Sequence, residues 1–229
     1  MLVSLRAEVC QANRELVSHG LVTLTWGNVS GIDRQQGLVV IKPSGVPYED
    51  LEPGHMVVVD LDGKRVEGHL SPSSDTPTHV LLYRHFTGIG GVTHTHSRYA
   101  TMYAQARCEI PCLGTTHADH FFGPVPVTRP LSSEEVVADY EGNTGRVIVE
   151  RFAHLKPLEM PAVLVAGHAP FTWGTTPRGS LHNSVALEAV AEMALGTMQI
   201  NRNSLFLEPY VLDKHYQRKH GPAAYYGQK

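Results

Sequence analysis

The chain has 229 residues, of which 42% are hydrophobic and 18% charged, and its formal net charge is -3 at pH 7. That length supports one large domain, or at most two small ones, with a substantial core. A slightly acidic chain offers no basic field, so nucleic acid is excluded as an expected partner.

Cysteine usage and the N-terminus indicate a location. The three cysteines are odd in number and lack Cys-x-x-Cys spacing, which argues against a disulfide framework and for a reducing compartment. The first residues lack the basic start, apolar run and small-residue cleavage site of a signal peptide. No apolar stretch approaches the ~20 residues that span a bilayer. We therefore expect a cytoplasmic protein without a membrane partner.

The first half of the chain predicts one helix followed mainly by strands. Apolar side chains at helical spacing predict a helix over residues 3–18, and Gly20 stands where a C-cap belongs. Turn signals separate the apolar runs that follow. These runs predict strands over residues 21–26, 29–32, 38–41 and 56–60.

The second half mixes helices with short strands. Ser132, with Glu135 three residues later, predicts a capped helix. The tail is polar and basic. Further helices are expected over residues 76–86, 98–106 and 179–199, with strands at 91–97, 162–166 and 171–174 and a loop-rich stretch over 111–130.

These elements predict a single α/β domain over residues 1–229. No repeat, low-complexity tract or linker divides the chain. Hairpins mixed with helices favour a central, mainly antiparallel sheet covered by helices on both faces, which is an α/β/α sandwich.

The segment from Gly91 to Ser97 carries His94 and His96 on an expected strand. Because side chains alternate along a strand, residues i and i+2 point the same way. The two imidazoles would then lie side by side, as a metal ion requires. Taken alone, they could also be two ordinary histidines beside a sheet.

Two further residues extend this possible site. Asp75 precedes an amphipathic helix, where it could simply cap the helix or instead contribute to an anion or metal site. A short helix-to-strand return would bring it near His94. His168 lies between two strand-like runs and could be a plain turn residue. Together Asp75, His94, His96 and His168 form a set without thiolates, suited to Zn²⁺ or to Mn²⁺ or Co²⁺.

Other polar residues could bind or turn over a substrate. Asp119 lies among histidines and hydroxyls, either as a solvated loop acid or as a general base. The run from Lys42 to Gly45 could hold a phosphate through backbone N–H groups and an ammonium. Each residue of this second set could instead be a plain turn residue. The set comprises Asn28, Lys42, Ser44, Gly45, Ser73 and Ser74.

Six segments in order resemble the L-ribulose-5-phosphate 4-epimerases of the class II aldolase/epimerase superfamily. The resemblance covers essentially the whole chain. The segments are Thr25-Trp26-Gly27-Asn28-Val29-Ser30, Ile41-Lys42-Pro43-Ser44-Gly45, Pro72-Ser73-Ser74-Asp75-Thr76-Pro77-Thr78-His79, Thr93-His94-Thr95-His96-Ser97, Gly114-Thr115-Thr116-His117-Ala118-Asp119 and the stretch from Arg218 to Gln228.

The resemblance implies an α/β/α sandwich in a homotetramer with active sites between subunits. The C-terminal tail, from about 208 to 229, would reach a neighbouring subunit's site. The implied metal ligands are His94, His96 and His168, with Asp75 as a fourth position. The acid/base pair falls on Asp119 and Tyr226. The implied substrate contacts are Gly27, Asn28, Lys42, Ser44, Gly45, Ser73, Ser74, Thr115, His215 and Arg218.

The activity implied is isomerisation of L-ribulose 5-phosphate to D-xylulose 5-phosphate by cleavage and re-formation of the C3–C4 bond, a step that ends both arabinose and ascorbate catabolism. Rival readings are an aldolase of fuculose or rhamnulose 1-phosphate, a metallohydrolase, and a non-catalytic module like the adducin head. The aldolases typically carry a glutamate near the position of Asp75, and the adducin head lacks the metal ligands.

Two positions depart from the family pattern. Many relatives have glycine where this chain has Ala169, directly after His168. If that glycine had a positive φ, alanine would strain the loop. His120 stands where relatives often have tyrosine, which is a milder change.

Overall fold

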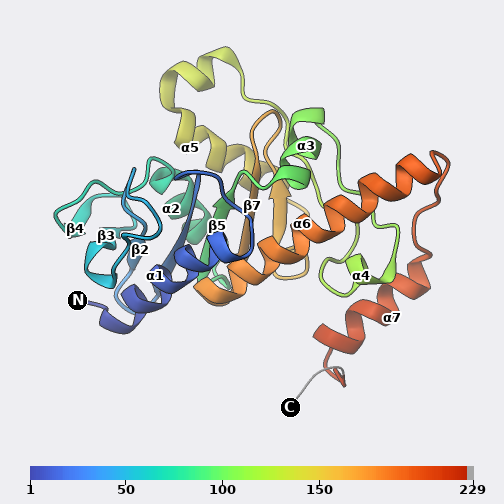
Figure 1. Ribbon diagram of the computed structural model, residues 1–229, viewed down its shortest axis with the longest axis horizontal. Helices are drawn as coiled ribbons and strands as arrows, with labels where there is room; N and C mark the ends of the chain where they lie inside the picture. Colours follow the sequence, from blue (N-terminus) through green and yellow to red (C-terminus); the bar gives the residue numbers. More distant parts are fainter. Residues whose placement is uncertain (226–229) are drawn as a thin grey trace.

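The computed structural model describes residues 1–225 and shows an α/β fold built on one sheet (Figure 1). The strands are β1 (Gly27–Asp33), β2 (Leu38–Ile41), β3 (Val57–Asp60), β4 (Arg65–Glu67), β5 (Gly91–Thr95), β6 (Ala162–Leu164) and β7 (Pro170–Gly174). The helices are α1 (Val3–Ser18), α2 (Thr76–His85), α3 (Arg98–Ala106), α4 (Thr115–Ala118), α5 (Ser133–Arg151), α6 (Pro177–Ile200) and α7 (Pro209–His220), with a 3-10 turn, η1, at Pro53–His55.

The strands form a single sheet in the order β4-β3-β2-β1-β5-β7-β6. Every pairing between them is antiparallel. β1 and β5 are central, and their register places Asn28 opposite His94. The sheet is therefore antiparallel as the sequence predicted, and its middle carries the first histidine of the expected site.

Apolar side chains alternate across the sheet and bury both of its faces. On β2, Val40 packs with residues of α1, whereas Val39 and Ile41 belong to the cluster that includes residues of α2 and α5. In Figure 1, α1 and α6 run side by side over one face, with the sheet behind them. Helices therefore cover both faces, which confirms the α/β/α arrangement.

Most predicted elements are present, and one is wrong. Ser132 caps α5 and forms the capping box with Glu135. The segment from Leu21 to Trp26 is not a strand, because Leu24 has a φ of 53° and exposes 76% of its surface. Its alternating apolar pattern mimics a strand, but the chain turns there before entering β1.

The C-terminal segment contains a helix that the polar tail did not suggest. α7 packs on α4, and its Tyr216 ring lies 5.0 Å from that of Phe122, in the loop that follows α4. Tyr216 is its only buried residue. Over residues 1–225, none of the helices is both long and apolar enough to cross a membrane.

Candidate active site

Three adjacent strands bring one row of side chains to the centre of the sheet. Asn28 of β1 is opposite His94 of β5, which in turn is opposite Phe171 of β7. The His94 ring stacks on Phe171, with centroids 4.1 Å apart and an interplanar angle of 17°. Gly27 leaves room for this row, since a Cβ there would lie 2.8 Å from the His94 carbonyl oxygen and its φ is +112°.

Three imidazoles gather beside that row. The ring of His94 lies 4.9 Å from that of His96 and 5.0 Å from that of His168, and the last two are 5.1 Å apart. One ring nitrogen from each lies within 4.8 Å of the other two. Two come from β5 and its end and the third from the turn between β6 and β7, so the structure brings together the three histidines that the sequence singled out.

The chemistry of these rings fits a divalent cation. Nδ1 of His94 is 3.0 Å from the Pro170 carbonyl oxygen, so it carries the proton and leaves the Nε2 lone pair available. Burial, with repulsion from His94, lowers the pKa of His96 to about 4 and that of His168 to about 3. Nδ1 of His168 is buried without a hydrogen-bond partner among the described residues. Neutral imidazoles with free lone pairs are what a zinc-type site requires.

Asp75 lies at the N-cap of α2, but its side chain does not cap the helix. Its Oδ2 instead accepts a hydrogen bond of 2.6 Å from the Asn28 amide and a longer one from Ser73. Burial opposes ionisation of Asp75, but attraction to His94 and the Asn28 hydrogen bond outweigh it and lower its pKa. The site thus holds an anion beside the three imidazoles, although Asp75 is not part of their close group of ligand atoms.

The run from Lys42 to Gly45 lines the same pocket as the histidines. The backbone N–H of Ser44 donates to Ser71, and that of Ser73 donates to the Lys42 carbonyl. These two bonds join the loops, and the first occupies the Ser44 N–H, one of the groups that the sequence had offered to a phosphate. Lys42 itself is buried, donates to the Pro43 and Val46 carbonyls, and has its pKa lowered by burial to about 8.

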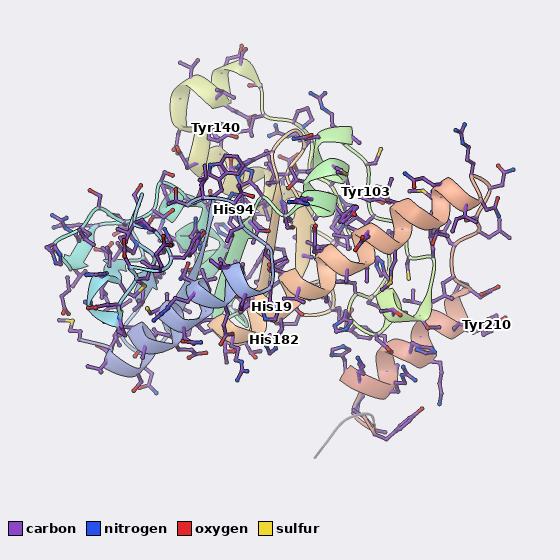
Figure 2. All side chains as sticks on the ribbon, viewed as in Figure 1. His19, His94, Tyr103, Tyr140, His182 and Tyr210 are labelled. Carbon is purple, nitrogen blue, oxygen red and sulfur yellow. The ribbon has the colours of Figure 1, made fainter. Side chains whose placement is uncertain are left out.

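The walls enclose a polar pocket of about 410 Å³. That volume suits a small sugar phosphate. Sequence reasoning did not find Tyr140 and Glu141, which reach the pocket because α5 is kinked at Asp139. Figure 2 shows Tyr140 and His94 on the same side of the molecule. The lining residues are Thr25, Trp26, Gly27, Asn28, Lys42, Pro43, Ser44, Gly45, Ser73, Ser74, Asp75, His94, His96, Tyr140, Glu141 and His168.

A second polar cluster forms where α4 meets α7, away from this pocket. Oδ1 of Asp119 is 3.1 Å from Nδ1 of His215, and both oxygens accept hydrogen bonds from Arg218, at 3.1 and 2.7 Å. Burial opposes ionisation, but the bonds from Arg218 and His215 outweigh it and keep the Asp119 pKa below its usual range. Lys219 adds a second cationic neighbour beside Arg218.

The two clusters are not joined within one subunit. None of Thr115, Asp119, His215 and Arg218 lines the histidine pocket. Figure 1 shows α4 and α7 at the far end of α6 from α1, and Figure 2 places Tyr210 of α7 well away from His94. Tyr226, the other expected acid/base residue, lies outside the described residues.

Comparison with known proteins decides the family. The Class II Aldolase and Adducin N-terminal domain profile matches residues 7–195. The chain belongs to this family. It is 55% identical over 225 residues to the L-ribulose-5-phosphate 4-epimerase UlaF of Salmonella paratyphi A, and equally to that of Salmonella typhi, covering 98% of this chain and 99% of each relative.

Solved structures of class II aldolase relatives share the fold. An L-fuculose 1-phosphate aldolase superposes with a TM-score of 0.79 at 23% identity, covering 94% of this chain and 95% of that one. YgbL of Klebsiella pneumoniae, described as a putative aldolase/epimerase/decarboxylase, superposes with a TM-score of 0.72 at 26% identity, covering 92% and 97%.

The departure at Ala169 from the class II aldolase pattern does not strain the turn. Among residues 1–225, the residues other than glycine with positive φ are Leu2, Leu24 and Arg107. The left-handed position of this turn belongs to Gly167, with a φ of +74°. Ala169 is fully buried, and its carbonyl accepts a hydrogen bond of 3.0 Å from Val165. Alanine therefore fits beside His168.

This geometry predicts that Ala169→Gly destabilises the protein. The substitution frees the unfolded chain and removes a buried methyl group, so the free energy of unfolding should fall by about 1–2 kcal/mol. Denaturant unfolding of the wild type and the variant measures the change. Gly167→Ala, which forces alanine into a left-handed conformation, should also destabilise. A more stable Ala169→Gly variant would mean that the alanine is strained.

Proposed function

We propose that the protein is a metal-dependent L-ribulose-5-phosphate 4-epimerase, an isomerase that interconverts L-ribulose 5-phosphate and D-xylulose 5-phosphate. The observation that carries the proposal is 55% identity to UlaF over nearly the whole of both chains. The cluster of His94, His96 and His168 beside a polar pocket supports it. The proposed metal is one Zn²⁺ per subunit, with Mn²⁺ or Co²⁺ as alternatives.

The proposed reaction inverts C4 without a redox step. A base takes the C4 hydroxyl proton, the C3–C4 bond breaks, and its electrons remain on the enediolate of dihydroxyacetone while glycolaldehyde phosphate forms. The aldehyde rotates and presents its other face, the bond re-forms, and an acid returns a proton to the new C4 oxygen. A cation held by the three histidines, with Asp75 as a fourth position, would act as a Lewis acid on the C2 and C3 oxygens.

The chain's own residues would hold the fragments in place. Lys42, Ser44, Ser73 and Ser74 line the same pocket as the histidines, where hydroxyl groups and an ammonium would bind the phosphate. Gly27, Asn28 and Gly45 also line this pocket. Holding the aldehyde by its phosphate keeps it from leaving between cleavage and re-addition.

Asp119 and Tyr226 would supply the acid and base. The low pKa of Asp119, imposed by Arg218 and His215, keeps this carboxylate ionised and able to accept a proton. Because Asp119 lies away from the histidine pocket of its own subunit, we assign it to the site of a neighbour. Thr115 and the C-terminal tail, residues 208–229 with Tyr226, would reach the same neighbouring site.

This arrangement requires an oligomer, which we propose to be a cytoplasmic homotetramer of single-domain subunits over residues 1–229. A ring of identical subunits repeats one interface, so each histidine pocket would meet one Asp119 surface. Each active site would then be shared by two subunits.

The activity is tested by a coupled assay that converts L-ribulose 5-phosphate to D-xylulose 5-phosphate. We expect turnover in the protein as purified, loss on chelation, and recovery on adding Zn²⁺, with about one divalent ion per chain by elemental analysis. His96→Asn should lose nearly all turnover, because removing a ligand weakens the metal site. His182→Asn, which changes an exposed histidine of α6, is the matched control.

Two outcomes would contradict the proposal. Near-normal turnover by metal-replete His96→Asn would argue against a catalytic ion at this site. Release of free aldehyde from a ketose 1-phosphate, with no pentulose phosphate epimerised, would indicate an aldolase instead.

The shared site predicts that two inactive variants can restore each other. His96→Asn lacks the metal side of the site and Asp119→Asn lacks the base side, so each is expected to be inactive alone. In an equal mixture, about one site in four would combine the metal side of an Asp119→Asn subunit with the base side of a His96→Asn subunit. Activity of the mixture after verified subunit exchange measures this, and a mixture that stays inactive would contradict a site shared between subunits.

A further inference from the structure

Polar side chains of β1 and α2 face each other beside the pocket, in a paired arrangement that we call the ladder. Asn28 and Ser30 lie two residues apart on β1 and so share a face. Asp75, at the N-cap of α2, His79 and Tyr83 lie four residues apart and share one side of the helix. Two strand residues rise about 6.6 Å and four helix residues about 6.0 Å, so the two series stay in step.

Hydrogen bonds join the strand residues to the helix residues at two levels. The Asn28 amide donates to Oδ2 of Asp75 over 2.6 Å. The Ser30 hydroxyl lies 2.7 Å from Nδ1 of His79 and 2.8 Å from the Tyr83 hydroxyl. Ser30, His79 and Tyr83 are all fully buried. Two hydrogen-bonded groups therefore follow one another from the pocket into the apolar core, with no side-chain hydrogen bond between them among the described residues.

The directions of these bonds fix the tautomer of His79. The Tyr83 hydroxyl is fully buried, and its hydrogen-bond partner among the described residues is Ser30, so we assign its proton to Ser30. The Ser30 hydroxyl then donates to Nδ1 of His79. Burial lowers the His79 pKa to about 3, so the ring is neutral and carries a single proton. With Nδ1 accepting, that proton lies on Nε2.

The Nε2–H of His79 finds no acceptor among the core residues that surround the ring. It is buried and has no hydrogen-bond partner among the described residues. The backbone N–H of His79 donates to the Asp75 carbonyl, which places the two residues one helical turn apart. Burial lowers the His79 pKa, whereas the charge of Asp75 acts to raise it, as expected for a carboxylate near the ring. A buried N–H one turn from a buried carboxylate has an obvious acceptor.

We propose that His79 is a positioning residue that donates its Nε2–H to the Asp75 carboxylate, in the tautomer set by Ser30 and Tyr83. Asn28 and His79 would then hold the carboxylate from two sides and keep it directed at His94, His96 and His168. The proposal rests on the metal site of the preceding section. Residues that orient ligands in this way typically change metal affinity about 10- to 100-fold when removed.

The tautomer can be measured directly. In protein labelled with ¹⁵N-histidine and freed of metal, two-bond ¹H–¹⁵N correlation spectra distinguish Nδ1–H from Nε2–H, and the signals missing in His79→Gln identify this ring. We expect Nε2–H in the wild type. In Ser30→Ala, which removes the donor to Nδ1, we expect the Nδ1–H form to appear. An Nδ1–H tautomer in the wild type would overturn the proposal.

Metal affinity provides the second test. In competition with a chromophoric chelator, His79→Phe should bind Zn²⁺ about 10- to 100-fold more weakly than the wild type. His79→Gln offers an acceptor to Ser30 and a donor to Asp75, so it should recover most of the affinity. His85→Gln, an exposed position on the same helix, should bind as the wild type does. Equal affinity in His79→Phe and the wild type would contradict the proposal.

Ser30→Ala covers the case in which the phenylalanine variant fails to fold. It should weaken Zn²⁺ binding, whereas Ser184→Ala, which removes a buried hydroxyl bonded to Thr172 on the α6 side, should not. An unchanged tautomer and affinity in Ser30→Ala would refute the role of the ladder.

A wild type that binds no Zn²⁺ would count against the metal site, and one that binds Zn²⁺ without epimerising would count against the activity. The tautomer measurement needs neither result.

Discussion

The pairing of β1 with β5 is the contact on which the whole site depends. It sets Asn28 opposite His94 and so decides which face of the sheet each side chain joins. From that one register, Asn28 reaches Asp75 at the start of α2, and His94 reaches the Pro170 carbonyl at the start of β7. The proposed metal ligands come from three separate segments, and the row of strand residues fixes the position of His94 among them.

The same row also explains the electrostatics of the pocket. Three imidazoles packed within about 5 Å of one another repel each other when they are positively charged, and burial also disfavours the charged form. The lowered pKa values of His96 and His168 leave the lone pairs of these two rings available, and Asp75 remains as the nearby anion. In the Asp119 cluster the balance is reversed, because Arg218 and Lys219 place positive charge beside one carboxylate. The chain thus has a histidine pocket suited to a cation and, at the far end of α6, a carboxylate paired with cations.

The sequence predicted those parts of the fold and site that depend on local patterns. Strand alternation placed His94 and His96 together, and the capping box located the start of α5 within one residue. The wrong strand at Leu21–Trp26 shows the limit of this reasoning, because a left-handed residue interrupts a pattern that looks continuous. α7 was missed because it buries only Tyr216 and is held largely by ion pairs to Asp119, about a hundred residues earlier in the chain. Tyr140 and Glu141 could not be placed from sequence, since they reach the pocket only through the kink at Asp139.

The ladder between β1 and α2 has a consequence for how this scaffold can diverge. Two residues of a strand span about the same length as four residues of a helix. A single inserted residue in β1 or α2 would therefore separate the hydrogen-bonded pairs that follow it. An inserted residue before Ser30 would turn its side chain to the opposite face, where α1 packs. A loop that borders the pocket, such as the run from Lys42 to Gly45, can change in length without moving these hydrogen-bonded pairs. The shape of the pocket opening can therefore vary while the paired residues of β1 and α2 keep their spacing.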